Sequence, residues 1–275
     1  EINSFKPKET YLKDKIAIER RIPRGPLLAI TPFSSPLSSP AHKISIGILV
    51  GTPVLFKPSP YAIKSGRALY EIIRAACNER FVYLLSENNE KVLEEIVADG
   101  RIGIISFTGS HGVGKKIIKY GGIKKYQMEL TGGSSSIIFT PEYQQYNDEL
   151  ADTILDGVIA KNGQRCVSVK HIFIPSQHGE FIECLQIKIQ KLKNDTKIDL
   201  RKGRNPSRLG PLITENSAKK TEEKIEEILR IAKNFDSLIE IERYKAYIFP
   251  TMYAISSINK SFLQKILRYE ISGPV

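Results

Sequence analysis

Blocks of apolar residues alternate with amphipathic stretches along the first half of the chain, and this pattern predicts alternating strands and helices. Four short, almost wholly apolar runs predict strands; they are PLLAIT (26–31), PVLFK (53–57), FVYLL (81–85) and GIISF (103–107). Strands that are apolar on both faces are typical of a parallel sheet covered by helices on each side. We therefore predict an α/β fold built on a parallel sheet.

One of the predicted helices has a defined start and a predicted buried face. Ser59 is suited to be its N-cap, and Pro60 follows at the first helical position, where proline is favoured. The apolar residues at helical spacing that form its predicted buried face are Ile63, Leu69, Ile72, Ile73 and Ala76.

Three connections that follow predicted strands are candidates for ligand binding. Parallel α/β sheets bind ligands beyond the carboxyl ends of their strands, so we expect residues 31–34, 57–60 and 108–112 to lie at one edge. In the last of these, Gly109 and Ser110 allow close backbone approach, and the start of the following helix offers free N–H groups to a phosphate. A lysine stands where a nucleoside-triphosphate loop needs a magnesium-binding Ser or Thr, which argues against an NTPase. The alternative is that the glycines only turn the chain.

The second half of the chain is predicted to start near Tyr126, and the first domain to end at about Leu130. Its predicted strands are YQMEL (126–130), SIIFT (136–140), RCVSVKHIFI (165–174) and YKAYIFPTMYAI (244–255), and its predicted helices cover about 148–161, 179–193 and 215–233, with a polar surface loop at 199–211. The first twenty residues are polar and give no assignable pattern. We predict two domains, at 1–130 and 131–275.

Cys166, in the stretch KNGQRCVSV, is the candidate nucleophile. Asn162 and Gly163 are turn-forming residues, so the helix before them should end there and leave Cys166 on a short corner with a free backbone amide. A thiolate beside a free amide can attack a carbonyl and hold the oxyanion that forms. Arg165 would favour the thiolate if its side chain pointed the same way. The alternative is a buried structural thiol.

Glu129 and Lys57 are the other candidate functional residues at strand ends. Glu129 lies between apolar neighbours before a glycine turn, and partial burial would make its carboxylate a stronger general base. The alternative is a strand-end salt bridge. Lys57 ends a strand at the predicted ligand edge, where it could bind ribose hydroxyls or phosphate. The alternative is a solvated surface lysine.

Composition limits the remaining possibilities. The formal net charge is +11, but the lysines are spread along the 275 residues and often stand beside glutamates, which favours solvated helix faces over a nucleic-acid surface. The three cysteines are widely separated and indicate a reducing, cytoplasmic location, and no apolar run is long enough to predict a membrane span. The histidines and cysteines have no metal-ligand spacing. A cysteine–histidine hydrolase using His171 or His178 remains an alternative.

Seven blocks, in the same order, resemble the NAD(P)-dependent aldehyde dehydrogenases. They are ITPFSSPLSSPAHKI, GTPVLFKPS, ISFTGSHGVGKKI, MELTGG, NGQRC, LGPLIT and YEISGPV. The resemblance implies a Rossmann-type coenzyme-binding domain at 1–130 and part of an α/β catalytic domain at 131–275. It also implies a small aldehyde substrate, oxidation to a carboxylic acid through a thioester with NAD or NADP as cofactor, and the possibility of a homo-oligomer.

The resemblance assigns a role to each matching residue. Cys166 corresponds to the nucleophile and Glu129 to the general base. The residues that correspond to nucleotide contacts are Lys57, Ser59, Pro60, Gly109, Ser110 and, at the nicotinamide ribose, Glu270. Lys43 matches a lysine implicated in proton relay.

An alternative function is suggested by Ser34, Ser272 and missing end segments, whereas Pro60 bears on the choice of nucleotide. Ser34 stands where the family has the asparagine donor of the oxyanion hole, and Ser272 replaces a phenylalanine. Pro60 stands where members that prefer NAD often carry an acid, which favours NADP. The chain also lacks segments at both ends of the family pattern. The alternative is a catalytically impaired fragment that serves as a nucleotide-binding or interaction module.

Overall fold

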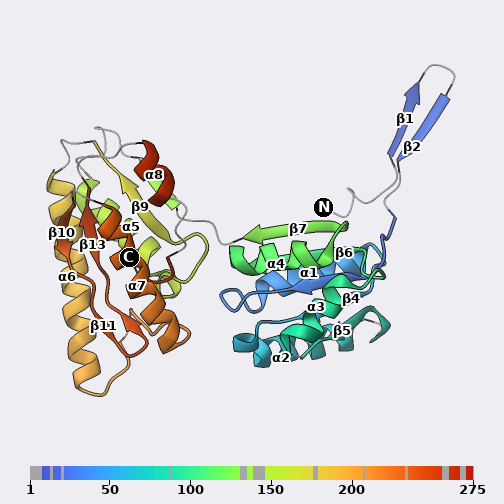
Figure 1. The fold of residues 1–275 in the computed structure, drawn as a ribbon, viewed down its shortest axis with the longest axis horizontal. Helices are drawn as coiled ribbons and strands as arrows, with labels where there is room; N and C mark the ends of the chain where they lie inside the picture. Colours follow the sequence, from blue (N-terminus) through green and yellow to red (C-terminus); the bar gives the residue numbers. More distant parts are fainter. Residues whose placement is uncertain are drawn as a thin grey trace. The chain divides into compact units, whose positions relative to one another are not determined.

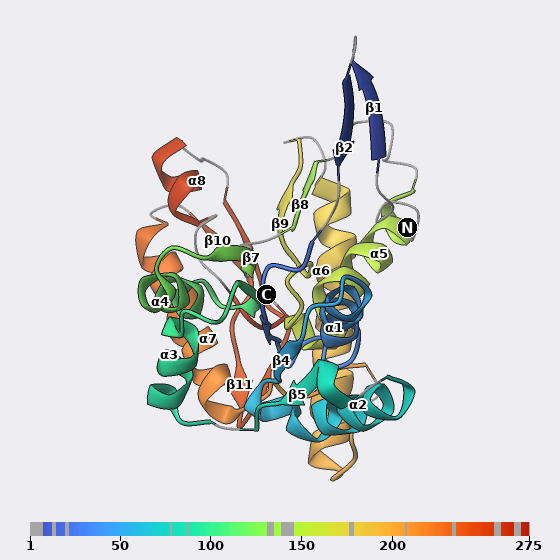
Figure 2. The same ribbon diagram turned by 90° about the vertical axis from the view of Figure 1, so that its right-hand side faces the viewer.

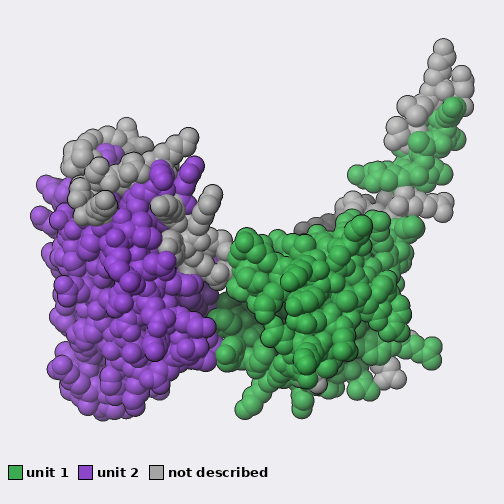
Figure 3. Space-filling model, in the orientation of Figure 1, with its two compact units in different colours: residues 1–131 green, residues 132–275 purple. Residues whose placement is uncertain are grey.

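The computed structural model describes the chain as two compact units, Glu1–Thr131 and Gly132–Val275 (Figure 3). The described residues are 8–12, 15–19, 22–77, 79–86, 88–130, 135–138, 146–175, 179–206, 208–232, 235–255, 260–266 and 271–274. Each unit has its own buried apolar residues.

The first unit is built on a five-stranded parallel sheet (Figure 1). In spatial order the strands are β5 (Val82–Leu84), β4 (Val54–Lys57), β3 (Leu27–Ile30), β6 (Ile104–Gly109) and β7 (Lys125–Leu130). The α/β parallel sheet predicted from the sequence is confirmed. Because the strand order reverses between β3 and β6, the carboxyl ends of these two strands flank the crevice in which such sheets bind ligands.

Helices cover both faces of this sheet (Figure 2). On one face, α1 (Ser38–Leu49) and α2 (Ile63–Ala76) pack against side chains that include Ala29 and Phe56. On the other face, α3 (Glu90–Ala98) and α4 (His111–Gly121) pack against side chains that include Leu28 and Ile105. Burial on both faces explains why β3 and the first three residues of β4 are apolar.

The predicted buried face of α2 is partly wrong. Ile72 is 66% exposed, and the residues that pack inward are Tyr70 and Ile73, on the same side as the buried Gly66. A Cβ atom on Gly66 would lie 2.7 Å from Cβ of Pro58. The helix is therefore rotated about its axis so that Gly66 lies close to the end of β4. The pattern of apolar residues alone did not predict this rotation.

Besides the sheet and its helices, the described residues of the first unit form a hairpin and two short 3₁₀ segments. The hairpin pairs β1 (Lys8–Leu12) with β2 (Lys15–Glu19), in the stretch that gave no assignable pattern. The 3₁₀ segments are η2 (Pro60–Ala62) and η3 (Glu79–Phe81).

The second unit packs its helices around short strand pairs. The helices are α5 (Asn147–Ile159), α6 (Gly179–Arg201), α7 (Glu215–Ile231) and α8 (Lys260–Ile266), and the 3₁₀ segment η5 covers Ala160–Gly163. The strand pairs are β8 (Ser135–Ile138) with β9 (Val169–Phe173), β10 (Asp236–Ile239) with β13 (Met252–Ala254), and β11 (Arg243–Tyr244) with β12 (Tyr247–Ile248). Its main core joins α5 and α6 to β9.

Helix α6 is longer than the sequence pattern predicted. It runs to Arg201, so the loop expected at 199–211 begins later. The buried stripe of α6 continues past residue 193 to Thr196, whose hydroxyl donates to the Leu192 carbonyl (2.8 Å). A buried threonine can extend an apolar stripe when its hydroxyl bonds back to the helix. Among the described residues, no helix is long and apolar enough to cross a membrane.

The turn before β6 provides a test of this packing. A Cβ atom on Gly103 would lie 1.7 Å from the Arg24 carbonyl oxygen, whereas one on Gly100 would meet nothing within 4 Å. We expect Gly103→Ala to lower the free energy of unfolding by about 3 kcal/mol, because backbone must move to relieve the overlap. Gly100→Ala should change it by less than about 1 kcal/mol. Equal urea midpoints for the two variants would contradict this packing.

Candidate functional site

The carboxyl edge of the parallel sheet carries several of the predicted nucleotide-binding residues. Lys57 ends β4 with 6% of its surface exposed, and its ammonium donates to the Pro58 carbonyl (3.0 Å). The hydroxyl of Ser59 accepts from the Tyr61 amide (3.3 Å), which confirms the predicted N-cap, and Pro60 is exposed at the first position of η2. The solvated-surface interpretation of Lys57 is therefore wrong.

The predicted loop at 108–112 is shorter than expected. Strand β6 continues through Gly109, only Ser110 separates it from α4, and the Ser110 hydroxyl accepts from the Val113 amide (3.4 Å). A Cβ atom on Gly109 would lie 2.6 Å from the Phe107 ring, so a side chain there would displace the ring. The first amides of α4 have no intrahelical acceptor and lie at the positive end of the helix dipole, an arrangement that can bind a phosphate.

Glu129 belongs to a polar network on the face of the sheet that α1 covers. Its carboxylate accepts from the Thr108 hydroxyl (2.7 Å) and the Gln127 amide (3.1 Å), and one oxygen lies 3.7 Å from the Lys43 ammonium. The Glu129 side chain is 54% exposed, so the partial burial that we expected is wrong. The alternative interpretation, an ion pair at a strand end, is present in the structure. Three groups therefore orient an accessible carboxylate.

Lys43 is the buried partner in this network. Its side chain is 3% exposed, and its ammonium donates to Ser106 Oγ (2.8 Å) and to Gln127 Oε1 (3.5 Å); Ser106 also donates to Gln127 Oε1. Burial lowers the pKa of Lys43, while the negative charge of Glu129 opposes that shift. The ammonium is thus held beside the carboxylate by neutral oxygen acceptors.

Sequence reasoning missed the partners of Glu129, although a signal for them was present. Ser106 and Thr108 on β6 stand opposite Gln127 and Glu129 on β7 in the parallel register. Polar residues two positions apart on each of two adjacent strands point to one face of a sheet. The two patterns together could have predicted a polar column there.

Cys166 lies in the second unit, on an exposed turn between η5 and β9. Lys161, Asn162 and Gly163 take left-handed backbone conformations, with φ angles of 50°, 60° and 67°. This confirms the predicted turn. Cys166 is exposed, which excludes the buried structural thiol. Within the described part of the chain, no group accepts a hydrogen bond from its backbone N–H.

Two side chains of this turn bind a distant segment. The Asn162 side chain accepts from the Gly210 amide (2.7 Å) and donates to the Pro211 carbonyl (3.1 Å). The Gln164 side chain accepts from the Ile213 amide (2.8 Å). Sequence reasoning gave Asn162 only a turn-forming role and gave Gln164 none. Short polar side chains flanking the turn were the only local signal.

A second distant segment meets the same turn. The Gly273 amide donates to the Gly163 carbonyl (3.1 Å), and the Lys170 ammonium donates to the carbonyls of both Gly163 (3.0 Å) and Gly273. Gly273 of the block YEISGPV therefore meets the block NGQRC, which also contacts LGPLIT, within the second unit. Lys170 was not singled out in the sequence, because nothing local distinguishes it from a surface lysine.

Other predicted site residues belong to different units or lie outside the described residues. Ser34 lies in the half-buried connection between β3 and α1, in the first unit, and Cys166 and Glu129 belong to different units. Their approach to one another stays a prediction. Glu270 and His178 lie outside the described residues.

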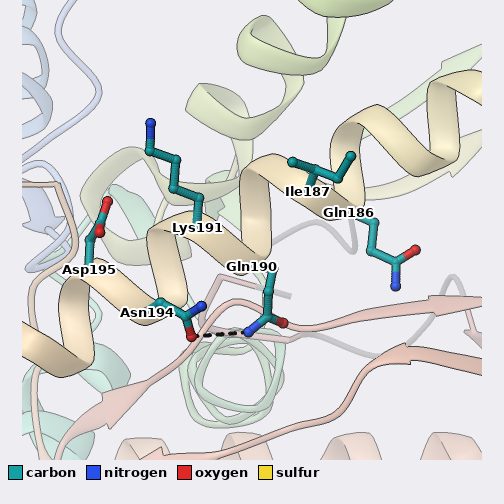
Figure 4. Close-up of a pocket in the computed structure, with 6 residues that line it drawn as sticks. All are labelled: Gln186, Ile187, Gln190, Lys191, Asn194 and Asp195. Carbon is teal, nitrogen blue, oxygen red and sulfur yellow. Dashed lines mark hydrogen bonds between the residues drawn. The ribbon is translucent and has the colours of Figure 1, made fainter.

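Within the described part of the chain, His171 and a depression on α6 add no candidate site. Burial and the neighbouring charge of Lys170 lower the pKa of His171, and its Nε2 atom is buried without a partner among the described groups. The described residues include no cluster that could hold a metal ion. A shallow depression is lined by six residues of α6 alone and contains none of the candidate residues (Figure 4).

Comparison with known proteins gives relatives along nearly the whole chain. A lactaldehyde dehydrogenase of Methanococcus aeolicus is 30% identical over 252 residues, which cover 90% of this chain and 52% of that protein. A 3-sulfolactaldehyde dehydrogenase of Priestia megaterium is 26% identical over 267 residues, covering 95% of this chain and 52% of that protein. The chain spans about half the length of the curated relatives it matches.

Solved structures give the same result. A glyceraldehyde-3-phosphate dehydrogenase of Methanocaldococcus jannaschii complexed with NADP superposes with a TM-score of 0.82 at 27% identity, over 100% of this chain and 58% of that chain. The family resemblance inferred from the seven motif blocks is confirmed. Because the model of the aldehyde dehydrogenase family matches residues 2–275, the chain belongs to that family.

Proposed function

We propose that the protein oxidises an aldehyde to a carboxylic acid with NAD or NADP, with Cys166 as nucleophile and Glu129 as general base. The observation that carries this proposal is the exposed Cys166 on a left-handed turn, next to a backbone amide with no described acceptor. The first unit would bind the nucleotide and the second would supply the nucleophile. The three described cysteines are free thiols, which suits a reducing compartment such as the cytoplasm.

The residues at the sheet edge fit a dinucleotide. Lys57 would bind the ribose or phosphate oxygens next to Ser59 and Pro60, and the pyrophosphate would meet Gly109, Ser110 and the first amides of α4. Glu270 is the proposed contact to the nicotinamide ribose. When bound, the nucleotide supplies the acceptor for a hydride.

The chain's own groups would then carry the reaction through two stages. The Cys166 thiolate adds to the aldehyde carbonyl, and the Cys166 amide, with Ser34 as the proposed second donor, holds the oxyanion. Loss of the hydride leaves a thioester on Cys166. Glu129 takes a proton from water, which attacks the thioester and releases the acid and the thiolate.

The bonds to Glu129 suit this second stage. Thr108 and Gln127 hold its two oxygens, and one of these oxygens lies 3.7 Å from the Lys43 ammonium. Because the side chain is 54% exposed, water can reach it. The overall balance consumes one aldehyde, one oxidised nucleotide and one water, and yields one acid, one reduced nucleotide and one proton.

The names of the relatives suggest the substrate class. Lactaldehyde, 3-sulfolactaldehyde and glyceraldehyde 3-phosphate, named for three relatives, are all short 2-hydroxyaldehydes. We propose a 2-hydroxyaldehyde as substrate. A panel of these compounds, with succinic semialdehyde and benzaldehyde for comparison, would test this by the rate at which the reduced nucleotide forms.

The first prediction concerns Cys166. Cys166→Ser should abolish aldehyde oxidation, by at least about 10³-fold, because a serine hydroxyl stays protonated without an adjacent base. Nucleotide binding, measured by titration calorimetry, should not change. Cys184→Ser on α6 is the matched control and should keep full activity. Activity that survives in Cys166→Ser would refute the assignment.

The second prediction concerns Glu129. Glu129→Gln should slow thioester hydrolysis by about 10²–10⁴-fold, because the amide accepts no proton from water. Stopped-flow absorbance should therefore record a burst of one reduced nucleotide per Cys166, followed by a slow steady rate. Glu90→Gln is a control, since Glu90 is exposed and pairs with Lys116 on α4. A burst followed by an unchanged steady rate would show that another group is the base.

The third prediction concerns the choice of nucleotide. Pro60 adds no negative charge where the 2′-phosphate of NADP would meet the start of η2 and α2. Pro60→Glu should weaken NADP binding by about tenfold or more, because two negative charges would face each other, and should affect NAD less. Gly100→Glu adds the same charge in the turn before β6 and should leave both dissociation constants unchanged. Equal losses for NAD and NADP in Pro60→Glu would argue against this placement.

A further inference from the structure

We propose that Lys170 is a positioning residue for Cys166, which ties the Gly163 carbonyl to the Gly273 carbonyl and so sets the path of the chain that presents the thiol. This inference rests on the proposed function, because it assigns Lys170 a part in the same reaction. Lys170 follows Cys166 by four residues and lies on β9, in the same unit.

A bulge in β9 directs Lys170 toward the turn. Ser135 of β8 stands opposite Val169, but the next residue, Ser136, stands opposite His171, so Lys170 is the extra residue. Val169 and Ile172, three positions apart, both pack into the core of the second unit, which regular alternation would not allow. Bulges of this kind re-aim a side chain and are common beside active sites.

The two carbonyls that Lys170 binds belong to segments 110 positions apart (273 minus 163). The Gly163 carbonyl accepts from the Lys170 ammonium (3.0 Å) and from the Gly273 amide (3.1 Å). A Cβ atom on Gly163 would lie 2.0 Å from the Gly273 oxygen. The two backbones are therefore in direct contact, and the ammonium, with three N–H donors, joins both acceptors at once.

The Gly273 segment is itself attached to the rest of the unit. The Thr221 hydroxyl on α7 donates to the Ser272 carbonyl, and the Thr251 amide beside β13 donates to the Pro274 carbonyl (3.3 Å). Lys170 therefore connects the cysteine turn to a segment that two other elements hold in place.

The cysteine turn requires such external attachment. Lys161 and Asn162 occupy the left-handed region, which costs a residue other than glycine about 1 kcal/mol or more and persists only where surrounding contacts impose it. Asn162 and Gln164 attach one side of the turn to the 210–213 segment. On the other side of the turn, Lys170 attaches Gly163 to the Gly273 segment.

The cost of placing a lysine here supports a functional role. Burial lowers the pKa of Lys170 to about 7, because desolvation disfavours the charged form, so keeping an ammonium here costs free energy. A methionine would fill similar space without that cost. Packing alone therefore does not account for the choice of a lysine, whereas the bridging of two carbonyls does.

The test compares Lys170→Met, which removes the donors, with Lys170→Arg, which keeps the charge and several N–H groups. Lys219→Met is the matched control, because Lys219 is 65% exposed on α7. In Lys170→Met we expect amide exchange at Gly273 to accelerate about tenfold and kcat to fall about 10–100-fold, since small misplacement of a reacting group costs rate on this scale. The KM for the nucleotide should change less than about threefold, and Lys170→Arg should recover most of kcat.

Two outcomes overturn the proposal. If Lys170→Met folds and its Gly273 amide exchanges at the wild-type rate, Lys170 does not anchor the turn. If its kcat is unchanged, Lys170 does not position Cys166. If Lys170→Met does not fold, Lys170→Gln, which is too short to reach both carbonyls, takes its place with the same expectations. A wild-type chain that oxidises no aldehyde would refute the proposed function, and the exchange measurement would still decide whether Lys170 anchors the turn.

Discussion

The contact between the backbones of Gly163 and Gly273 is the constraint on which the cysteine site depends. The Gly163 Cα has no room for a side chain on the side of the Gly273 carbonyl, and its φ angle of 67° suits glycine. This contact holds the left-handed turn closed from one side while Asn162 and Gln164 hold it from the other. The result is an exposed thiol beside a backbone amide for which the described residues supply no acceptor.

In the first unit, hydrogen bonds hold the Glu129 carboxylate in a defined orientation at the end of a strand. Burying the Lys43 ammonium carries a desolvation cost, and the oxygens of Ser106, Gln127 and Glu129 offset it. Glu129 is at the accessible end of this network. The buried cation therefore contacts three polar residues on two strands, and Thr108 joins the network through Glu129.

The departures from the family pattern take on a physical meaning in the structure. Ser272 lacks the ring of a phenylalanine, but its carbonyl accepts from Thr221, so its backbone still helps to hold the Gly273 segment. Ser34 offers a hydroxyl where the family has an amide donor, which leaves the Cys166 amide as the main proposed support for an oxyanion. Pro60 leaves the first turn of η2 without an acid, which is compatible with either NAD or NADP.

The sequence by itself determined the parallel α/β sheet, the order of its strands and helices, the Ser59 cap and the turn before Cys166, because these follow from local apolar runs and from the preferences of glycine, asparagine and proline. Only the tertiary structure decided that Gly66 turns α2, that Glu129 is exposed, and that Lys43 reaches β6 and β7. It also decided that Lys170 faces the turn. Predicting which way a strand residue points relies on regular alternation of side chains, and the bulge in β9 interrupts that alternation. Contacts between residues 60 to 110 positions apart have no local signal, since they depend on how separately formed segments pack against one another.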